Sequence, residues 1–345
     1  MKTEAAKSAR PALQLTLLWP MAALVLLLAF NLIFTPGFFH IEIGEKGYLS
    51  GSLIDILKNG STVMLLSLGM TLVIATGGVD LSVGAVMAIA GAVAATLISR
   101  VDGSFTAAVI AALGVSLLAG ALNGLLVGLF RIQPIVATLV LMVAGRGVAQ
   151  LITDGQIITF TNARLAYVGN GHLLGLPVPV WIVATMLLVT AFWTRRTAWG
   201  LFIESVGDNE RASLYAGINS RAVQFIVYLF SGLCAGLAGL LAASNIKAAD
   251  ANHAGLFFEL DAILAVVVGG TALTGGRFYL VGSLVGALLI QTLTTTMYMR
   301  DVSSDVASVP KALVILAVCL LQSPVFRRQI RGLMAMTGLA VRRAP

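Results

Sequence analysis

A short polar stretch interrupts an otherwise apolar region between residues 61 and 98. It reads Gly77-Gly78-Val79-Asp80-Leu81-Ser82, and Asp80 is the only carboxylate between Asp55 and Asp102. Both flanks are apolar and long enough to lie in a bilayer, where a carboxylate costs about 2.5 kcal/mol or more. Two compatible roles would justify that cost. Asp80 can cap the helix that restarts near Leu81, or it can line a transport pathway.

Arg146 is a second costly residue, in the sequence Ala144-Gly145-Arg146-Gly147. It lies about 9 Å of helix from the outer end of its apolar segment. It therefore either extends to the lipid headgroups or pairs with an acceptor, for which Asp80 and Asp261 are the natural choices. Gln150 lies one helical turn further along, on nearly the same face.

Asn123 and Gln291 are uncharged polar residues inside apolar segments, where they can also bond between helices without touching substrate. The predicted pathway residues are Asp80, Ser82, Asn123, Arg146, Gln150, Asp261 and Thr274.

The chain lacks the motifs of the common catalytic sites. We find no G-x-S-x-G, no H-E-x-x-H and no G-x-x-x-x-G-K-[ST], and no histidine falls in a predicted span. Cys234 and Cys319 both lie in apolar runs without the spacing of metal ligands. We therefore expect no catalytic residue, no metal and no cofactor, and any ATP hydrolysis must belong to a partner chain.

The composition indicates which elements position these residues. The chain has 345 residues, of which 58% are hydrophobic and 11% charged, with a mean hydropathy of +0.96. Soluble domains carry about 25% charged residues, so the sequence predicts an all-α polytopic membrane protein. The net charge of +7 comes from basic residues scattered singly, which indicates membrane orientation rather than nucleic-acid binding.

About ten apolar segments are candidate transmembrane helices. Most of the 22 lysines and arginines fall on the inner side if both termini are cytoplasmic. This topology gives a cytoplasmic tail over 1–16, a transmembrane domain over 17–325 and a basic cytoplasmic tail over 326–345. The segments are 17–35, 61–77, 81–99, 105–130, 134–152, 178–194, 222–243, 261–274, 278–297 and 309–324.

The largest inner loop, about 195–221, is the most polar stretch of the chain. Asp208 or Asn209 can cap a short helix that runs to Tyr215, and Gly217 can terminate it. Such a helix can dock into a groove on another protein. The alternative is an ordinary solvated turn.

The first hinge pattern recurs near the end of the chain. Residues 77–84 and 269–276 share the pattern G-G-x-x-L-[S/T]-x-G. Both copies end a segment that runs inward, so the internal repeat would be parallel. Glycine-interrupted segments at corresponding positions of two halves are typical of transport sites.

Three stretches resemble one known family. The sequences GMTLVIATGGVDLSVG (69–84), IQPIVATL (132–139) with GRG (145–147), and ELDAILAVVVGG (259–270) are similar to the ribose-type permeases of ABC sugar importers. The resemblance extends from about residue 17 to 325. Within the family, GRGVAQLIT (145–153) and ADANHAGL (249–256) are most similar to the galactofuranose-type permeases.

The resemblance implies a multi-pass subunit of the bacterial inner membrane that imports a monosaccharide, with galactofuranose as the candidate. Its partners would be a cytosolic ABC ATPase, a periplasmic sugar-binding protein, a second permease chain (identical or different) and membrane lipid. The loop contacting the ATPase would use Glu204, Gly207, Asn209, Arg211, Tyr215 and Gly217. Ser205 and Val206 depart from the E-A-A pattern of maltose-type permeases.

Two other functions are compatible with the residues themselves. One is an ion-coupled secondary transporter of sugars or amino acids, in which Asp80 and Asp261 would be the coupling carboxylates. The other is a structural membrane scaffold.

Overall fold

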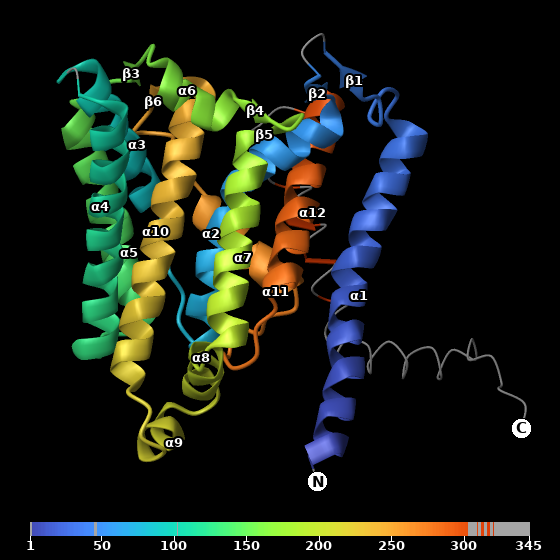
Figure 1. The fold of residues 1–345 in the computed structure, drawn as a ribbon, viewed down its shortest axis with the longest axis vertical. Coiled ribbons are helices and arrows are strands. Elements are labelled where there is room, and N and C mark those ends of the chain that lie inside the picture. The colour runs from blue at the N-terminus through green and yellow to red at the C-terminus, as the bar shows by residue number, and fades with distance from the viewer. Residues whose placement is uncertain are drawn as a thin grey trace, which may run out of the picture.

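The long apolar helices stand side by side in a computed structural model of the chain (Figure 1). The structure describes residues 2–302 except 45, 46 and 102, with side-chain surroundings from Leu18 onward. Beyond 302 it describes Val309, Ala312, Leu313, Leu316, Ala317 and Leu320. The tenth predicted span, 309–324, and the tail 326–345 thus lie largely or wholly outside the described residues.

The described elements are mostly helical. The long helices and the π-helical turn η1 are α1 (Lys2–Phe34), α2 (Ser52–Ala75), α3 (Val83–Ser99), α4 (Phe105–Gly124), η1 (Leu125–Leu129), α5 (Pro134–Thr153), α7 (Val178–Arg196), α10 (Ser220–Ile246), α11 (Phe258–Val268) and α12 (Leu280–Met299). The shorter helices are α6 (Ala163–Asn170), α8 (Trp199–Asp208) and α9 (Glu210–Tyr215). The strands are β1 (Glu42–Ile43), β2 (Leu49–Ser50), β3 (Ile158–Thr159), β4 (His172–Leu173), β5 (Leu176–Pro177) and β6 (Ala248–Ala249).

The helix lengths confirm a polytopic membrane protein and correct two boundaries. Within the described residues, 6 helices are long and apolar enough to span a membrane, while Leu18–Phe34 and Val83–Ser99 are shorter apolar helices. The predicted span 261–274 is wrong. Only α11, with 11 residues, forms there, and about 16 Å of helix is too short for a hydrocarbon core of about 30 Å. The predicted span 61–77 begins earlier than expected, because α2 starts at Ser52.

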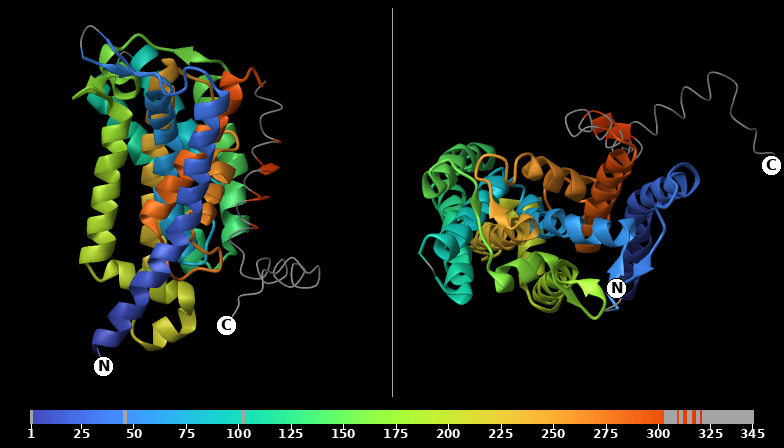
Figure 2. Two further views of the ribbon diagram at one scale, coloured as in Figure 1. Left: turned by 90° about the vertical axis from the view of Figure 1, so that its right-hand side faces the viewer. Right: turned by 90° about the horizontal axis from the view of Figure 1, so that it is seen from above.

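Helix α2 lies at the centre of the bundle. Every residue from Gly60 to Ala75 is buried, and α2 packs against α7, α10, α11 and α12. Helices α3, α4 and α5 lie on the far side of α10 from α1, which stands at the edge against α12 (Figure 2). Close approach of α4 to α10 depends on glycine, since a Cβ at Gly120 would lie 2.6 Å from the carbonyl oxygen of Tyr228.

The outer loops are joined to one another. Strand β3 pairs antiparallel with β6, so the loop after α5 is tied to the loop after α10. The ring of Tyr48 stacks on His172 with centroids 4.6 Å apart, and the N–H of Leu49 donates to the carbonyl of Gly175. These contacts connect three segments that are far apart in the sequence.

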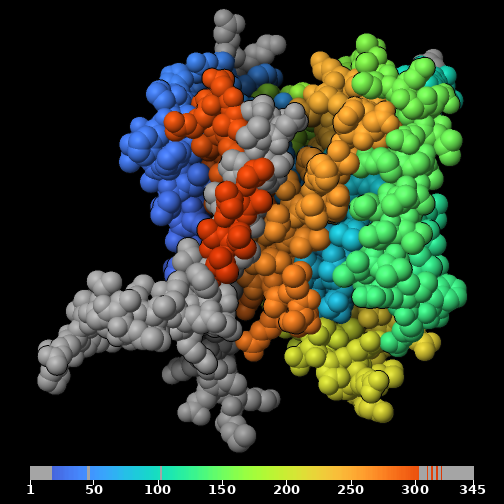
Figure 3. All heavy atoms as spheres, turned by 180° about the vertical axis from the view of Figure 1, so that it is seen from behind, coloured from blue at the N-terminus to red at the C-terminus, as the bar shows by residue number. Residues whose placement is uncertain are grey.

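The inner loop forms α8 and α9 at the opposite end of the bundle from the outer loops (Figure 3), on the same side as the N-terminus (Figure 1). The predicted short helix is confirmed as α9, and the side chain of Asn209 caps it by accepting from the N–H of Ala212 at 3.0 Å. Helix α8 is partly inserted into the bundle, because Ile203 and Val206 are buried in a cluster with Leu72 and Phe278.

Candidate functional site

The first hinge, Thr76–Ser82, encloses Asp80 in a network of hydrogen bonds. One carboxyl oxygen of Asp80 accepts from the hydroxyl of Ser82 at 2.6 Å and from the Ser82 N–H at 3.0 Å. The same oxygen lies 3.4 Å from the donating amide of Asn123. The other oxygen accepts from the hydroxyl of Ser231 at 2.8 Å. Asp80 is 1% exposed.

This network joins three helices at one buried point. Asp80 accepts the N–H two residues ahead, in an Asx turn just before α3 begins at Val83; the predicted helix cap by Asp80 is not formed, because Ser82 occupies the N-cap position and no side chain caps it. Asn123 of α4 also donates to Ser82 at 2.8 Å, and Ser231 comes from α10. The sequence identified Asp80, Ser82 and Asn123 but missed Ser231. Its position beside Gly232, in a helix with a Gly232/Gly236 pair, was the available signal.

The second hinge, Gly269–Tyr279, lies nearer the inner surface. The hydroxyl of Thr271 accepts from the N–H of Tyr279 at 3.2 Å, while Thr274 is exposed. Asp261 is half-buried in the first turn of α11. The Thr274 backbone nevertheless lies beside the first hinge, since a Cβ at Gly77 would be 3.8 Å from the Thr274 carbonyl oxygen.

Both hinges meet α8 at Gly207. A Cβ at Gly207 would lie 1.8 Å from the carbonyl oxygen of Ala75 and 2.5 Å from the nitrogen of Gly276. The N–H of Gly276 donates to that same Ala75 carbonyl at 2.9 Å. A Cβ at Gly275 would lie 2.8 Å from the Gly207 oxygen and 2.9 Å from the Gly77 nitrogen. Three backbone segments thus touch where a side chain cannot fit.

Arg146 and Gln150 hold the outer loop that follows β6. The Arg146 guanidinium donates to the carbonyls of Ala251, at 3.1 Å, and Ala254. Gln150 donates to the Asn252 side chain at 2.9 Å. The structure thus gives Arg146 different partners from the carboxylates considered from the sequence, because the loop carbonyls after α10 reach its level.

The same loop contacts the first hinge from the outer side. A Cβ at Gly84, in the first turn of α3, would lie 2.2 Å from the carbonyl oxygen of Gly255. Within the loop, partial burial raises the pKa of Asp250. Hydrogen bonds from His253 and from the N–H groups of Asn252 and His253 outweigh that effect and hold this pKa below its usual value.

The predicted ATPase-contact residues lie around α8 and α9. Glu204 lies 4.0 Å from Arg195, and Glu210 pairs with Arg131 at the end of η1. Arg211 and Gly217 are exposed, and Tyr215 is 91% exposed. An exposed aromatic side chain beside a basic one is a surface suited to a protein partner.

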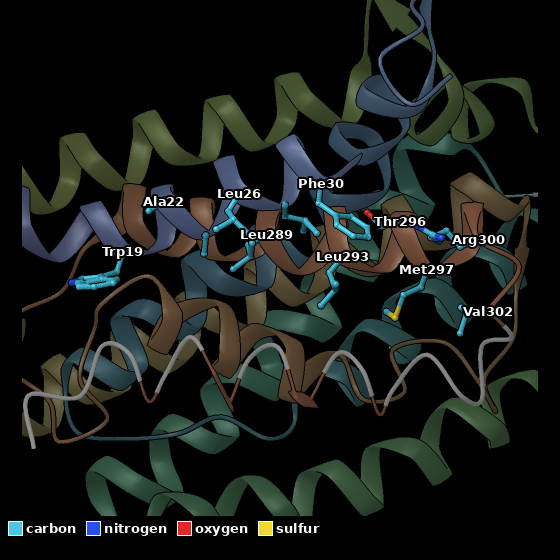
Figure 4. A pocket seen from close by; sticks show the side chains of 12 residues that line it. Trp19, Ala22, Leu26, Phe30, Leu289, Leu293, Thr296, Met297, Arg300 and Val302 are labelled. Carbon is cyan, nitrogen blue, oxygen red and sulfur yellow. The ribbon is translucent and has the colours of Figure 1, made fainter. Parts of the chain in front are cut away.

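Two cavities of similar volume differ in chemistry. One of about 630 Å³ lies between α1 and α12 and is lined by apolar side chains apart from Thr296 and Arg300 (Figure 4). The other, of about 580 Å³, lies in the outer half beside α2, and its mainly apolar lining also contains polar side chains of α2, α10, α12 and the loop after β6. No group of three or more metal-ligating side chains occurs among the described residues. The polar cavity is the candidate for a hydrophilic substrate.

Comparison with known proteins adds the family. Residues 52–319 match the family described as the branched-chain amino acid transport system permease component. The chain belongs to this permease family. It is therefore a multi-pass membrane permease of a bacterial ABC importer, the non-enzymatic component that works with an ATPase and a binding protein.

Named relatives cover nearly the whole chain. A galactofuranose transporter permease of Escherichia coli (strain K12) is 51% identical over 91% of this chain and 93% of its own length. A ribose import permease of the same strain is 39% identical over 87% and 92%, respectively. A fructose import permease of Bifidobacterium longum is 37% identical over 94% and 92%. No solved structure matches the chain significantly.

Proposed function

We propose that this permease imports a monosaccharide and that its substrate is galactofuranose. The three relatives described above are named for galactofuranose, ribose and fructose, and identity is highest, at 51%, with the galactofuranose permease. The GRGVAQLIT and ADANHAGL stretches support the same choice, because Arg146, Gln150 and Asn252 within them hold the outer loop together.

The observation that carries the mechanism is the junction of α8 with both hinges at Gly207. Because no side chain separates these backbones, a displacement of α8 moves the end of α2 and the second hinge together. The partner ATPase would push on α9 through Arg211, Tyr215 and Gly217, and α8 would transmit that movement to the hinges. The two glycine hinges, in parallel orientation, would then open the pathway alternately to each side.

The residues predicted for the pathway have two different roles in the proposed mechanism. Asp80, Ser82 and Asn123 fix the point about which α3 turns, while Thr274 and Asp261 lie along the moving second hinge and α11. A second permease chain completes the transport unit. In a galactofuranose-type system that chain would differ from this one.

Reconstitution tests the proposal directly. The permease, its ATPase and its binding protein are placed in proteoliposomes, and uptake of galactofuranose, D-ribose, D-fructose and L-leucine is compared. We expect ATP-dependent sugar uptake, fastest for galactofuranose, without leucine uptake. Transport of leucine alone would disprove the sugar assignment. Sugar uptake that needs a proton gradient and not the ATPase would establish an ion-coupled transporter instead.

Gly207→Ala tests the coupling route, with Gly114→Ala as the matched control because a Cβ at Gly114 meets nothing within 4 Å. The first change should reduce ATP-driven uptake more than tenfold while leaving ATPase binding intact. The second should change neither. Normal uptake by Gly207→Ala would show that the junction does not transmit movement.

A further inference from the structure

The polar cavity of about 580 Å³ has walls from four helices and one loop. Helices α2, α3, α10 and α12 and the loop after β6 enclose it in the outer half of the protein. At its inner end, Met87 and Ala88 of α3 lie beside Gly255, which crosses the start of α3 at Gly84. The cavity therefore ends at the outer side of the first hinge, which is the position a substrate must pass if that hinge gates transport.

Stripes of polar side chains on two neighbouring helices, α2 and α12, line the cavity. On α2 the stripe consists of Asp55, Asn59 and Thr62, at a spacing that places them on one helical face. On α12 the stripe begins at Gln291 and contains Thr294, Thr295 and Tyr298. The Gln291 side chain lies against α2, since a Cβ at Gly60 would lie 3.2 Å from its Cγ. Polar stripes on otherwise apolar membrane helices face an aqueous space.

These side chains retain hydrogen-bonding capacity. Asn59 accepts one bond, from Asn245 at 3.2 Å, and Gln291 donates one long bond of 3.5 Å to Thr295. Each carboxamide offers two donors and two acceptor positions, so most of the capacity remains for a ligand. Vicinal hydroxyl groups, which donate and accept at once, match such a surface.

The charged side chains that line the cavity favour a neutral ligand over an anionic one. The lining contains the carboxylates of Asp55 and Asp250 and the imidazole of His253, and it contains no lysine or arginine. An amino acid or another anion would need a cationic partner for its carboxylate. Phe258 and Tyr298 add flat apolar surfaces suited to the C–H face of a sugar ring. The volume falls within the usual range for a small-molecule site.

We infer that this cavity is the chamber in which the permease holds a neutral monosaccharide after the binding protein releases it, with Asp55, Asn59, Gln291 and Thr295 binding its hydroxyl groups. The inference rests on the proposed import of a monosaccharide, and it adds the place and the residues of recognition.

The test uses the complete importer in proteoliposomes, supplied with binding protein loaded with the imported sugar. Gln291→Leu and Thr295→Val each remove hydrogen bonds at nearly constant volume, so we expect sugar uptake to fall about 2- to 10-fold for each. Thr185→Val is the matched control, because Thr185 is an exposed residue of α7 that bonds only within its own helix. Thermal melting and ATPase binding of each variant establish that folding and assembly are unchanged.

A second measurement detects the sugar in the chamber. Thr295→Cys, in a chain carrying Cys319→Ser and the buried native Cys234, is treated from the outside with a thiol reagent. Sugar-loaded binding protein should slow labelling at least 2-fold, and empty binding protein or L-leucine should not. Unchanged uptake in both substituted chains, or equal labelling with and without sugar, would overturn the chamber. Absence of sugar uptake by the unaltered importer would instead overturn the proposed function.

Discussion

The two hinges share one sequence pattern and differ in burial. At the first, Asp80 and Ser82 are 1% and 0% exposed and bonded to α4 and α10. At the second, the corresponding positions are Ala272 and Thr274, and both are exposed. The carboxyl group is thus present only at the hinge that the bundle encloses.

This difference separates two tasks. The first hinge is fixed from both sides, by the Gly207 junction at its inner end and by the Gly84–Gly255 crossing at its outer end. The second hinge meets α8 at the same junction; within it, Thr271 and Phe278 are buried, whereas residues 272–274 are exposed. We interpret the first as the pivot and the second as the segment that moves against it.

Removing the Asp80 network should have the largest effect. Asp80→Ala leaves the buried hydroxyls of Ser82 and Ser231 without their acceptor, and each unpaired buried group costs about 1–3 kcal/mol. We expect loss of most folded protein, measured as the yield of monodisperse permease in detergent. Asp80→Asn keeps one acceptor oxygen and should retain folding and transport. Equal yields for both variants would show that the pivot does not depend on this residue.

Alanine substitutions at the hinge glycines near Gly207 should have effects of intermediate size on stability, and these effects should differ between the two hinges. At Gly275 a Cβ would meet backbone atoms within 3.0 Å and φ is 89°, whereas at Gly77 φ is 79° but the nearest atom is 3.8 Å away. Gly275→Ala should therefore lower the melting temperature more than Gly77→Ala, for which about 1–2 kcal/mol of backbone strain is the only cost. The opposite order would mean that the three backbones separate in the membrane.

The smallest effects on stability are expected at Ser82 and Thr274, which occupy the same position in the two copies of the glycine pattern. Ser82→Ala removes bonds to Asp80 and Asn123 and should cost about 1–2 kcal/mol, while Thr274→Val should stay within about 0.5 kcal/mol. Denaturation of the two variants in detergent measures the difference. A Thr274→Val cost equal to that of Ser82→Ala would remove the distinction between pivot and moving segment.

Much of the architecture followed from hydropathy and local capping. Apolar runs located most of the described long helices, and the Asn209 cap with Gly217 located α9. The predicted span 261–274 is wrong because Gly269 and Gly270, which belong to the glycine pattern found in the sequence, already end the helix at Val268. The second span was predicted to begin at residue 61, whereas α2 begins at Ser52, because Asp55, Lys58 and Asn59 interrupt the apolar run.

The residues that line the polar cavity also could not be identified from the sequence. Asp55, Asn59 and Thr294 are unremarkable in the sequence, and Gln291 was expected only to bond another helix. They form one surface because α2 and α12 run side by side, and the contacts between these helices are set by packing across more than 200 residues of chain.

The sequence by itself determined that the chain crosses the membrane many times, that two glycine hinges interrupt it and that Asp80 needs buried donors. Composition and glycine spacing are local properties, and the bilayer fixes their consequences. Only the tertiary structure decided which donors those are, that Gly207 touches both hinges and that Arg146 holds the outer loop. These contacts depend on how α8, α10 and the loop after β6 pack against α2, and packing between distant segments is not encoded in local spacing.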